Sequence, residues 1–329
     1  MIKIPEKIEL ANLPTKIEKL NNLTRILNGP DIYIKRDDQT GTELSGNKVR
    51  KLEFAIKEAL EQDCDYLITC GGIQSNHCRA TAAAAAKLGL KSFLVLRSND
   101  TPQTDGNLLL DKLFGADIEF ISSDNYKFNR MEIMEEIKEN LEKKGFKPYI
   151  IPEGASNGIG TFGYYNAMEE IISQEKALGI HFDAIVLAVG SGGTYSGLFL
   201  ASKLLKHNAK IIGINVCDDA EHFKNRINEI VLESLNYLNI NLSFSKDEIN
   251  IIDGYVGRGY ALSQKEELDF IYNLSKLEGL ILDPVYTGKA MLGLTKEIEK
   301  GTFNNYKNIL FIHTGGIYGL FPQKDLFEF

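Results

Sequence analysis

Short apolar runs alternate with longer segments of helical period along almost the whole chain. Each run has the length of a strand, and each intervening segment is long enough for a helix. This alternation is typical of an α/β fold in which helices cover both faces of mostly parallel sheets. We expect strands at residues 31–35, 66–70, 92–96, 118–121, 149–151, 184–189, 211–216 and 308–313.

Three intervening segments carry clear helical features. Residues 47–62 place their apolar side chains at helical spacing, and residues 75–88 contain an alanine-rich run suited to close packing. Residues 131–144 are strongly charged, with an acidic start and a basic end that suit the helix dipole. Residues 154–160 are rich in small side chains and give the best crossing point between two lobes.

Composition restricts the function classes. The 329 residues are 43% hydrophobic and 25% charged, which is the balance of a folded globular protein with room for two domains. A net charge of −8 offers nothing to a phosphate backbone or an anionic membrane, so neither nucleic acid nor membrane is an expected partner. The four cysteines form no C-x-x-C pair and indicate neither a disulfide framework nor a zinc site. The N-terminus lacks the regions of a signal peptide, and a cytoplasmic location is expected.

Four glycine-bearing turns adjoin strong elements, at residues 45–48, 71–76, 190–194 and 314–316. In α/β sheets ligands bind at the carboxyl ends of strands, where these turns are expected to converge. Residues 190–194 follow an apolar strand and open a helix expected to begin at Tyr195. Successive backbone N–H groups and a positive helix end can receive a phosphate there.

Neither common nucleotide motif is complete. A dinucleotide fingerprint needs a third glycine where Tyr195 stands, and a P-loop needs a hydroxyl residue where Val49 follows Lys48. What remains is a small phosphate-bearing cofactor that requires no nucleotide motif. A lysine at a helix start favours pyridoxal phosphate, which binds such a lysine as a Schiff base.

Several ordered motifs carry a resemblance to a known family. They are Ile34-Lys35-Arg36-Asp37-Asp38, Ser45-Gly46-Asn47-Lys48-Val49-Arg50-Lys51, Gly72-Ile73-Gln74-Ser75-Asn76-His77, Gly190-Ser191-Gly192-Gly193-Thr194, Asp283-Pro284-Val285-Tyr286-Thr287-Gly288-Lys289 and His313-Thr314-Gly315-Gly316. In this order they resemble the D-cysteine desulfhydrase and aminocyclopropane-carboxylate deaminase family over nearly the whole chain. The resemblance implies a two-domain, fold-type-II pyridoxal-phosphate enzyme related to the tryptophan synthase β subunit.

The resemblance also implies where the cofactor binds. It makes Lys48 the Schiff-base lysine and the proton carrier at the substrate α-carbon, in preference to Lys51 one turn later. It makes Asn76 a contact of the cofactor's ring oxygen and places Thr314 opposite the pyridine nitrogen. The implied phosphate loop is Gly190, Ser191, Gly192, Gly193 and Thr194.

Other matched residues are expected to face the substrate. Ser75, Asn76 and His77 lie at a helix start, where a substrate carboxylate would meet oriented donors. The resemblance gives Ser75 a catalytic role as well, but His77 is not expected to act as a general base. Tyr260 and Tyr286 match family tyrosines near the substrate, where a phenol can transfer a proton to or from a leaving group.

Two positions separate the branches of the family. The deaminases carry glutamate where this chain has Thr287, a residue expected to bind substrate, and leucine where it has Thr314. A hydroxyl near the pyridine nitrogen does not hold that nitrogen protonated as a carboxylate does, which favours β-elimination. We therefore expect a lyase that converts D-cysteine to pyruvate, ammonia and hydrogen sulfide. The alternatives are a cysteate sulfo-lyase, a broader β-substituted alanine lyase, the deaminase and, last, a non-catalytic amino-acid-binding protein.

The resemblance finally predicts how the chain is organised. Residues 1–50 and 161–329 are expected to form a larger cofactor-binding domain, with residues 51–160 inserted as a smaller domain. Family enzymes of this kind also imply a homodimer.

Overall fold

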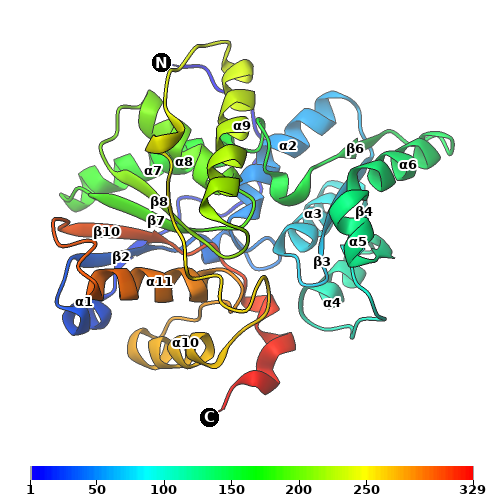
Figure 1. The fold of residues 1–329 in the computed structure, drawn as a ribbon. Helices are drawn as coiled ribbons and strands as arrows, with labels where there is room; N and C mark the ends of the chain where they lie inside the picture. The colour runs from blue at the N-terminus through cyan, green and yellow to red at the C-terminus, as the bar shows by residue number, and fades with distance from the viewer. Residues whose placement is uncertain (1, 329) are drawn as a thin grey trace.

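The computed structural model describes residues 2–328, which form two parallel-type sheets with helices around them (Figure 1). Six strands build the larger sheet in the order β1-β2-β10-β7-β8-β9, and four build the smaller in the order β5-β4-β3-β6. All neighbouring strands run parallel except β1 and β2. The strands are β1 (Ile17–Lys19), β2 (Asp31–Lys35), β3 (Tyr66–Gly72), β4 (Lys91–Arg97), β5 (Asp117–Ile121), β6 (Pro148–Ile150), β7 (Ala184–Val189), β8 (Lys210–Asn215), β9 (Asn250–Ile252) and β10 (Asn308–Ile312).

Helices cover both faces of the larger sheet because its central strands are apolar on both sides. Alternate residues of β7 belong to two different core clusters: Ile185 and Leu187 to one, Val186 and Ala188 to the other. In Figure 1, α7, α8 and α9 lie above this sheet, and α1, α10 and α11 lie below it. The helices are α1 (Asn21–Leu27), α2 (Lys48–Glu61), α3 (Asn76–Leu88), α4 (Gly106–Leu113), α5 (Ser123–Phe128), α6 (Arg130–Glu142), α7 (Phe162–Leu178), α8 (Gly193–Leu204), α9 (Ala220–Leu238), α10 (Lys265–Glu278) and α11 (Thr287–Glu299).

The smaller sheet is likewise covered on both sides. Ile68 and Cys70 of β3 pack with Met134 and Ile137 of α6. Small alanine side chains on α3 let this helix pack closely beside β3 and β4. The four strands lie between residues 66 and 150, within the segment expected to form an inserted domain.

The predicted α/β class is confirmed, and all eight expected strands are present with ends within two residues of the prediction. The prediction missed β1 and β9, which have three residues each and lie at the two edges of the larger sheet. The helix expected from Tyr195 begins two residues earlier, at Gly193. Gly192, with φ of 86°, completes the turn, so the chain can enter the helix directly after it.

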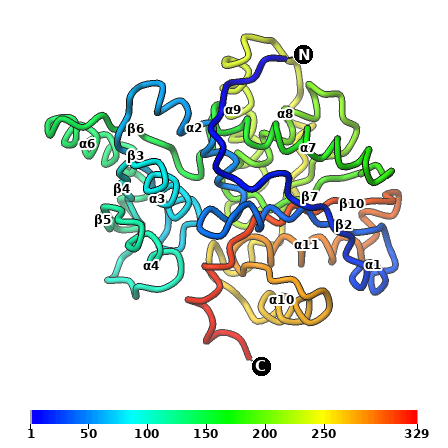
Figure 2. Tube along the Cα trace, turned by 180° about the vertical axis from the view of Figure 1, so that it is seen from behind, coloured from blue at the N-terminus to red at the C-terminus, as the bar shows by residue number. Residues whose placement is uncertain are grey.

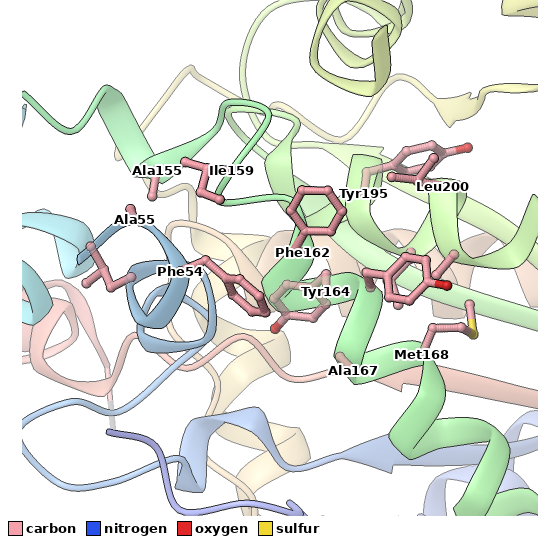
Figure 3. Packing of buried hydrophobic residues seen from close by; sticks show 14 of the residues in the cluster. Phe54, Ala55, Ala155, Ile159, Phe162, Tyr164, Ala167, Met168, Tyr195 and Leu200 are labelled. Atoms are coloured by element: carbon pink, nitrogen blue, oxygen red, sulfur yellow. The ribbon is translucent and has the colours of Figure 1, made fainter. Parts of the chain in front are cut away.

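Helices α2 and α7 pack closely together within the larger core cluster (Figure 3). The rings of Phe54 and Phe162 lie 6.0 Å apart between centroids. A Cβ added to Gly163 would come within 2.4 Å of the Arg50 carbonyl oxygen, so the backbones touch where these helices cross. This contact fixes the position of α2 relative to the larger sheet.

A buried ionic network holds the first turn of α2. Arg50 donates to both oxygens of Asp37, at 2.8 and 3.0 Å, and to Glu170 at 3.0 Å. Lys35 donates to the second oxygen of Glu170 at 2.5 Å, and the Tyr164 hydroxyl donates to Asp37. Burial alone would raise the pKa of Asp37, but Arg50 and Lys35 outweigh this effect and hold that pKa below its usual value. The network joins α2 to β2 and α7.

The N-terminal segment runs down the back of the molecule before it reaches β1 (Figure 2). The Glu53 carboxylate of α2 accepts the amides of Leu10 and Ala11, each at 2.8 Å. Among the described residues, no helix combines the length and the apolar character needed to cross a bilayer.

We predict that Arg50→Met lowers the free energy of unfolding by about 3–5 kcal/mol, because it leaves the buried Asp37 carboxylate without its bidentate cation, while Glu170 keeps only Lys35. Arg36→Met is the matched control. The Arg36 guanidinium pairs with Asp38 and Glu18 in a more exposed position than the Arg50–Asp37 pair, and exposed pairs contribute only about 0–1 kcal/mol. Denaturant unfolding of both variants measures the difference, and equal midpoints would refute the structural role of the network.

Candidate active site

One cavity lies where strands of both sheets end. Its walls come from the turn after β3, the turn after β7, the segment after β10 and the start of α2. The four glycine turns singled out in the sequence therefore do converge. The cavity is lined by Asn47, Lys48, Gly72, Ser75, Asn76, His77, Glu153, Gly154, Ala188, Val189, Gly190, Ser191, Gly192, Thr194, Tyr195, Tyr260, Tyr286 and Thr314.

Lys48 supplies the amine of this site. It is the first residue of α2 and is partly exposed to the cavity, while its amine lies deep inside the protein. Burial lowers the pKa of Lys48 to about 8, although the nearby Glu153 carboxylate opposes the shift. A substantial fraction of the amine is thus neutral near physiological pH, as nucleophilic attack on an aldehyde requires.

Lys51, the competing lysine, does not line the cavity. It is fully buried one turn further along α2, and its Nζ lies 3.3 Å from the Ser156 hydroxyl. Ser156 in turn shares a hydrogen bond of 2.8 Å with Ser191 of the glycine loop. Burial and the charge of Lys48 lower the pKa of Lys51 well below its usual value. An anion bound at the loop would favour the protonated form of Lys51. The sequence did not indicate this role for Lys51.

The backbone of the loop of residues 190–194 lies very close to neighbouring residues, which leaves little room for side chains at its glycines. A Cβ on Gly193 would come within 2.6 Å of the Ser156 hydroxyl, and Gly192 has the positive φ that favours glycine. The loop leads into the twelve-residue helix α8, whose N-terminus carries a partial positive charge. Asn47 donates to the Thr194 hydroxyl at 2.9 Å and so ties the loop to the start of α2. Of the five loop residues, only Gly193 lies outside the cavity lining.

The start of α3 forms the opposite wall. Ser75 is the N-cap residue, and its hydroxyl accepts the Cys78 amide at 3.1 Å. His77 Nε2 lies 2.8 Å from the Thr69 hydroxyl. Burial and the charges of Lys48 and Lys51 lower the pKa of His77 well below its usual value, so the imidazole stays neutral. A pKa this low makes the imidazole a weak proton acceptor.

Tyr260 and Tyr286 meet at the cavity, and their hydroxyls share a short hydrogen bond. Burial raises the pKa of both phenols, so both stay protonated through neutral pH. The backbone amide of Tyr286 donates to Asp283 at 2.9 Å, which fixes the start of α11. The pair places two phenolic protons on the cavity wall.

The two threonines that separate the family branches lie in different places. Thr314 lines the cavity, and its carbonyl oxygen accepts the Asn47 amide at 3.1 Å. Thr287 is fully buried and outside the cavity lining: its hydroxyl donates to Asp283 Oδ1 at 2.7 Å and accepts the Asp283 amide at 2.9 Å. The expected substrate contact of Thr287 therefore has no direct counterpart in this geometry.

Glu153 and Gly154 also line the cavity, although the sequence marked this region only as a crossing between lobes. A Cβ on Gly154 would lie 2.8 Å from the Ser191 hydroxyl and 3.2 Å from the Lys48 amine. The composition of residues 154–160 was the available signal, because small residues are needed where a ligand and two loops come close.

These residues fit pyridoxal phosphate. Lys48 offers a neutral amine for the aldehyde, and the loop of Gly190 to Thr194 offers backbone donors and a helix N-terminus for the phosphate. A side chain on Gly193 or Gly154 would fill the space beside Ser156, Ser191 and Lys48. When bound, the cofactor withdraws electrons from the substrate α-carbon.

Comparisons with known proteins agree with this geometry. The profile of a family described as pyridoxal-phosphate dependent enzyme matches residues 8–315. A bifunctional D-cysteine desulfhydrase/1-aminocyclopropane-1-carboxylate deaminase of Arabidopsis thaliana, named as mitochondrial, is 46% identical over 96% of this chain and 79% of its own. A D-cysteine desulfhydrase of Yersinia pestis is 40% identical over 96% and 95%. A putative 1-aminocyclopropane-1-carboxylate deaminase of Thermotoga maritima is 42% identical over 97% and 98%.

Solved structures lead to the same group. The crystal structure of an aminocyclopropane-carboxylate deaminase homologue superposes with a TM-score of 0.90 at 39% identity, over 98% of this chain and 95% of that one. An O-ureido-L-serine synthase shares the fold at a TM-score of 0.69 and 15% identity, over 96% and 94%. With its lysine, glycine loop and full-length relatives, the chain belongs to the pyridoxal-phosphate dependent enzymes, in the family of the D-cysteine desulfhydrases and aminocyclopropane-carboxylate deaminases.

Proposed function

We propose that the protein is a lyase that eliminates the thiol of D-cysteine and yields pyruvate, ammonia and hydrogen sulfide with the uptake of one water. The observation that supports this proposal is the meeting of Lys48 with Tyr260 and Tyr286 at one cavity. A β-elimination needs a base at the α-carbon and an acid at the leaving group, and this site offers an amine and two protonated phenols.

The residues of the site divide the steps of this mechanism, and Asn76 would also donate to the ring oxygen of the bound cofactor. The Lys48 amine takes the α-proton, and a bound pyridoxal phosphate would supply the electron sink for the pair left at the α-carbon. Ser75 and Asn76, at the start of α3, bind and orient the substrate carboxylate. The Tyr260–Tyr286 pair donates a proton to the departing sulfur, so hydrogen sulfide leaves as a neutral molecule.

A second candidate is the ring-opening deaminase, because curated relatives carry that name as well. Two features favour the eliminating branch. Thr314 presents a neutral hydroxyl at the cavity, and Thr287 supplies no carboxylate at the position where the deaminases have glutamate. Ring opening expels no thiol, and it therefore depends more on stabilising negative charge at the pyridine nitrogen.

We predict that borohydride reduction of the holoenzyme attaches the cofactor to Lys48. Trypsin cleaves after Arg50 and so separates the two lysines: a modified Lys48 appears in the peptide of residues 37–50, and a modified Lys51 in that of residues 51–57. Lys48→Ala should also lower turnover by at least about 10²-fold. Mass spectrometry of the peptides decides, and a label on Lys51 would refute the assignment.

We predict that the apoprotein binds pyridoxal phosphate faster as the pH rises through about 8, because only the neutral Lys48 amine attacks the aldehyde. The Glu153 carboxylate favours the charged amine, so Glu153→Gln should move this profile toward lower pH. Glu119→Gln, at an exposed glutamate of β5, is the control and should leave the profile in place. Stopped-flow absorbance measures the rates, and a Glu153→Gln profile shifted to higher pH would contradict the electrostatics.

We predict that the wild type releases sulfide from D-cysteine and opens the ring of aminocyclopropane-carboxylate at least about tenfold more slowly, a barrier difference of ~1.4 kcal/mol. Pyruvate and sulfide are measured separately on D-cysteine, L-cysteine, cysteate, β-chloroalanine and aminocyclopropane-carboxylate. Thr314→Leu tests the cavity hydroxyl by itself. The double variant Thr287→Glu, Thr314→Leu tests both branch positions together. Its Thr287→Glu change buries a second carboxylate beside Asp283, so its folding is checked before its activity is compared. Rapid ring opening without sulfide from D-cysteine would overturn the proposal.

A further inference from the structure

Asn107, on α4, lies outside the cavity lining yet contacts a residue of its wall. Its side chain is fully buried and makes three hydrogen bonds. The amide oxygen accepts from Arg79 Nε at 3.2 Å, and the amide nitrogen donates to the Gln74 carbonyl and to Asn76 Oδ1, both at 3.0 Å. Asn107 thus connects α4 to the first residue of α3.

These partners leave only one orientation for two amides. Arg79 can only donate, so the oxygen of Asn107 must face it, and the Gln74 carbonyl can only accept, so the nitrogen must face that group. With Asn107 fixed, Asn76 has to present its own oxygen to the Asn107 nitrogen. The Asn76 nitrogen, which carries both donors, is then the end left for the cavity that Asn76 lines.

The other end of Arg79 reaches the segment before the reactive lysine. Its Nη1 donates to the Glu43 carbonyl at 2.5 Å and its Nη2 to the Ser45 carbonyl at 2.9 Å, three residues before Lys48. Arg79 is itself fully buried. A single chain of hydrogen bonds therefore joins the approach to Lys48, through Arg79 and Asn107, to Asn76 on the opposite wall.

We propose that Asn107, anchored by Arg79, is a positioning residue that keeps the Asn76 amide nitrogen turned into the cavity as a donor to the cofactor's ring oxygen. This inference rests on the proposed contact between Asn76 and the cofactor. A donor at that oxygen stabilises its anionic form and lowers the proton affinity of the bound cofactor. Asn107 therefore tunes the cofactor without touching it.

The test is the pH titration of the bound cofactor's absorption, which a general loss of stability does not move. Asn76→Ala removes the donor and should raise the titration midpoint by up to about one pH unit. Asn107→Leu should raise it in the same direction. In the Asn76→Ala background, Asn107→Leu should add no further shift, because the residue it positions is gone.

The results distinguish the positioning role of Asn107 from the contact between Asn76 and the cofactor. A shift in Asn76→Ala without one in Asn107→Leu overturns the inference and leaves the Asn76 contact standing. No shift in Asn76→Ala overturns both. An Asn107→Leu shift that persists in the Asn76→Ala background shows that Asn107 acts by another route, and it also overturns the inference.

Two further variants guard against effects of folding. Asn107→Asp keeps an acceptor for Arg79 but removes the donors, so it should also raise the midpoint, and a folded Asn107→Asp protein with the wild-type midpoint overturns the inference. Asn215→Leu is the matched control: Asn215 is a fully buried amide at the end of β8, outside the cavity lining. It should lower stability and leave the titration midpoint unchanged, and a shift as large as that of Asn107→Leu would count against a specific role.

Discussion

The placement of α2 depends on the bidentate pair between Arg50 and Asp37. Burying these charges is unfavourable unless every partner is present, and Glu170, Lys35 and Tyr164 complete the set. The network therefore holds the first turn of α2 in one position relative to β2 and α7. Because Lys48 lies two residues before Arg50, the same constraint fixes where the reactive amine enters the cavity.

Lys48 and Lys51 lie one turn apart in a buried region, where two positive charges are unfavourable. Burial lowers the pKa of both Lys48 and Lys51, and the charge of Lys48 lowers that of Lys51 further. A bound pyridoxal phosphate would react with the Lys48 amine through its aldehyde, and its phosphate would bring negative charge to the loop in front of Lys51. The chemistry of the site and the stability of its walls are thus linked through the same ligand.

The glycines of the quoted motifs serve contacts between backbones from distant parts of the chain. A Cβ on Gly46 would come within 2.7 Å of the Thr314 carbonyl oxygen, and one on Gly315 within 2.8 Å of the Gly46 Cα atom. The segment before Lys48 and the segment after β10 can therefore touch only because both positions are glycine. Two motifs that are more than 260 residues apart in the sequence form one wall.

Local sequence patterns and ordered motifs were enough to predict most of the strands and the class of chemistry. Among the described residues, local periodicity located eight of the ten strands and the helices α2, α3 and α6. The family resemblance pointed to Lys48, the glycine loop, Ser75, Asn76 and the two tyrosines, and all of these except Gly193 line one cavity. The burial of Lys51 behind the loop, the turn of Thr287 toward Asp283 and the contact of Asn107 with Asn76 follow from the packed fold and have no signal in the sequence. The three-residue edge strands β1 and β9 were also missed, because so few residues give little periodicity to detect, although β6, of the same length, was predicted. The physical reason is common to these cases: burial, hydrogen-bond direction and edge pairing arise between segments far apart in the chain, and no local pattern encodes them.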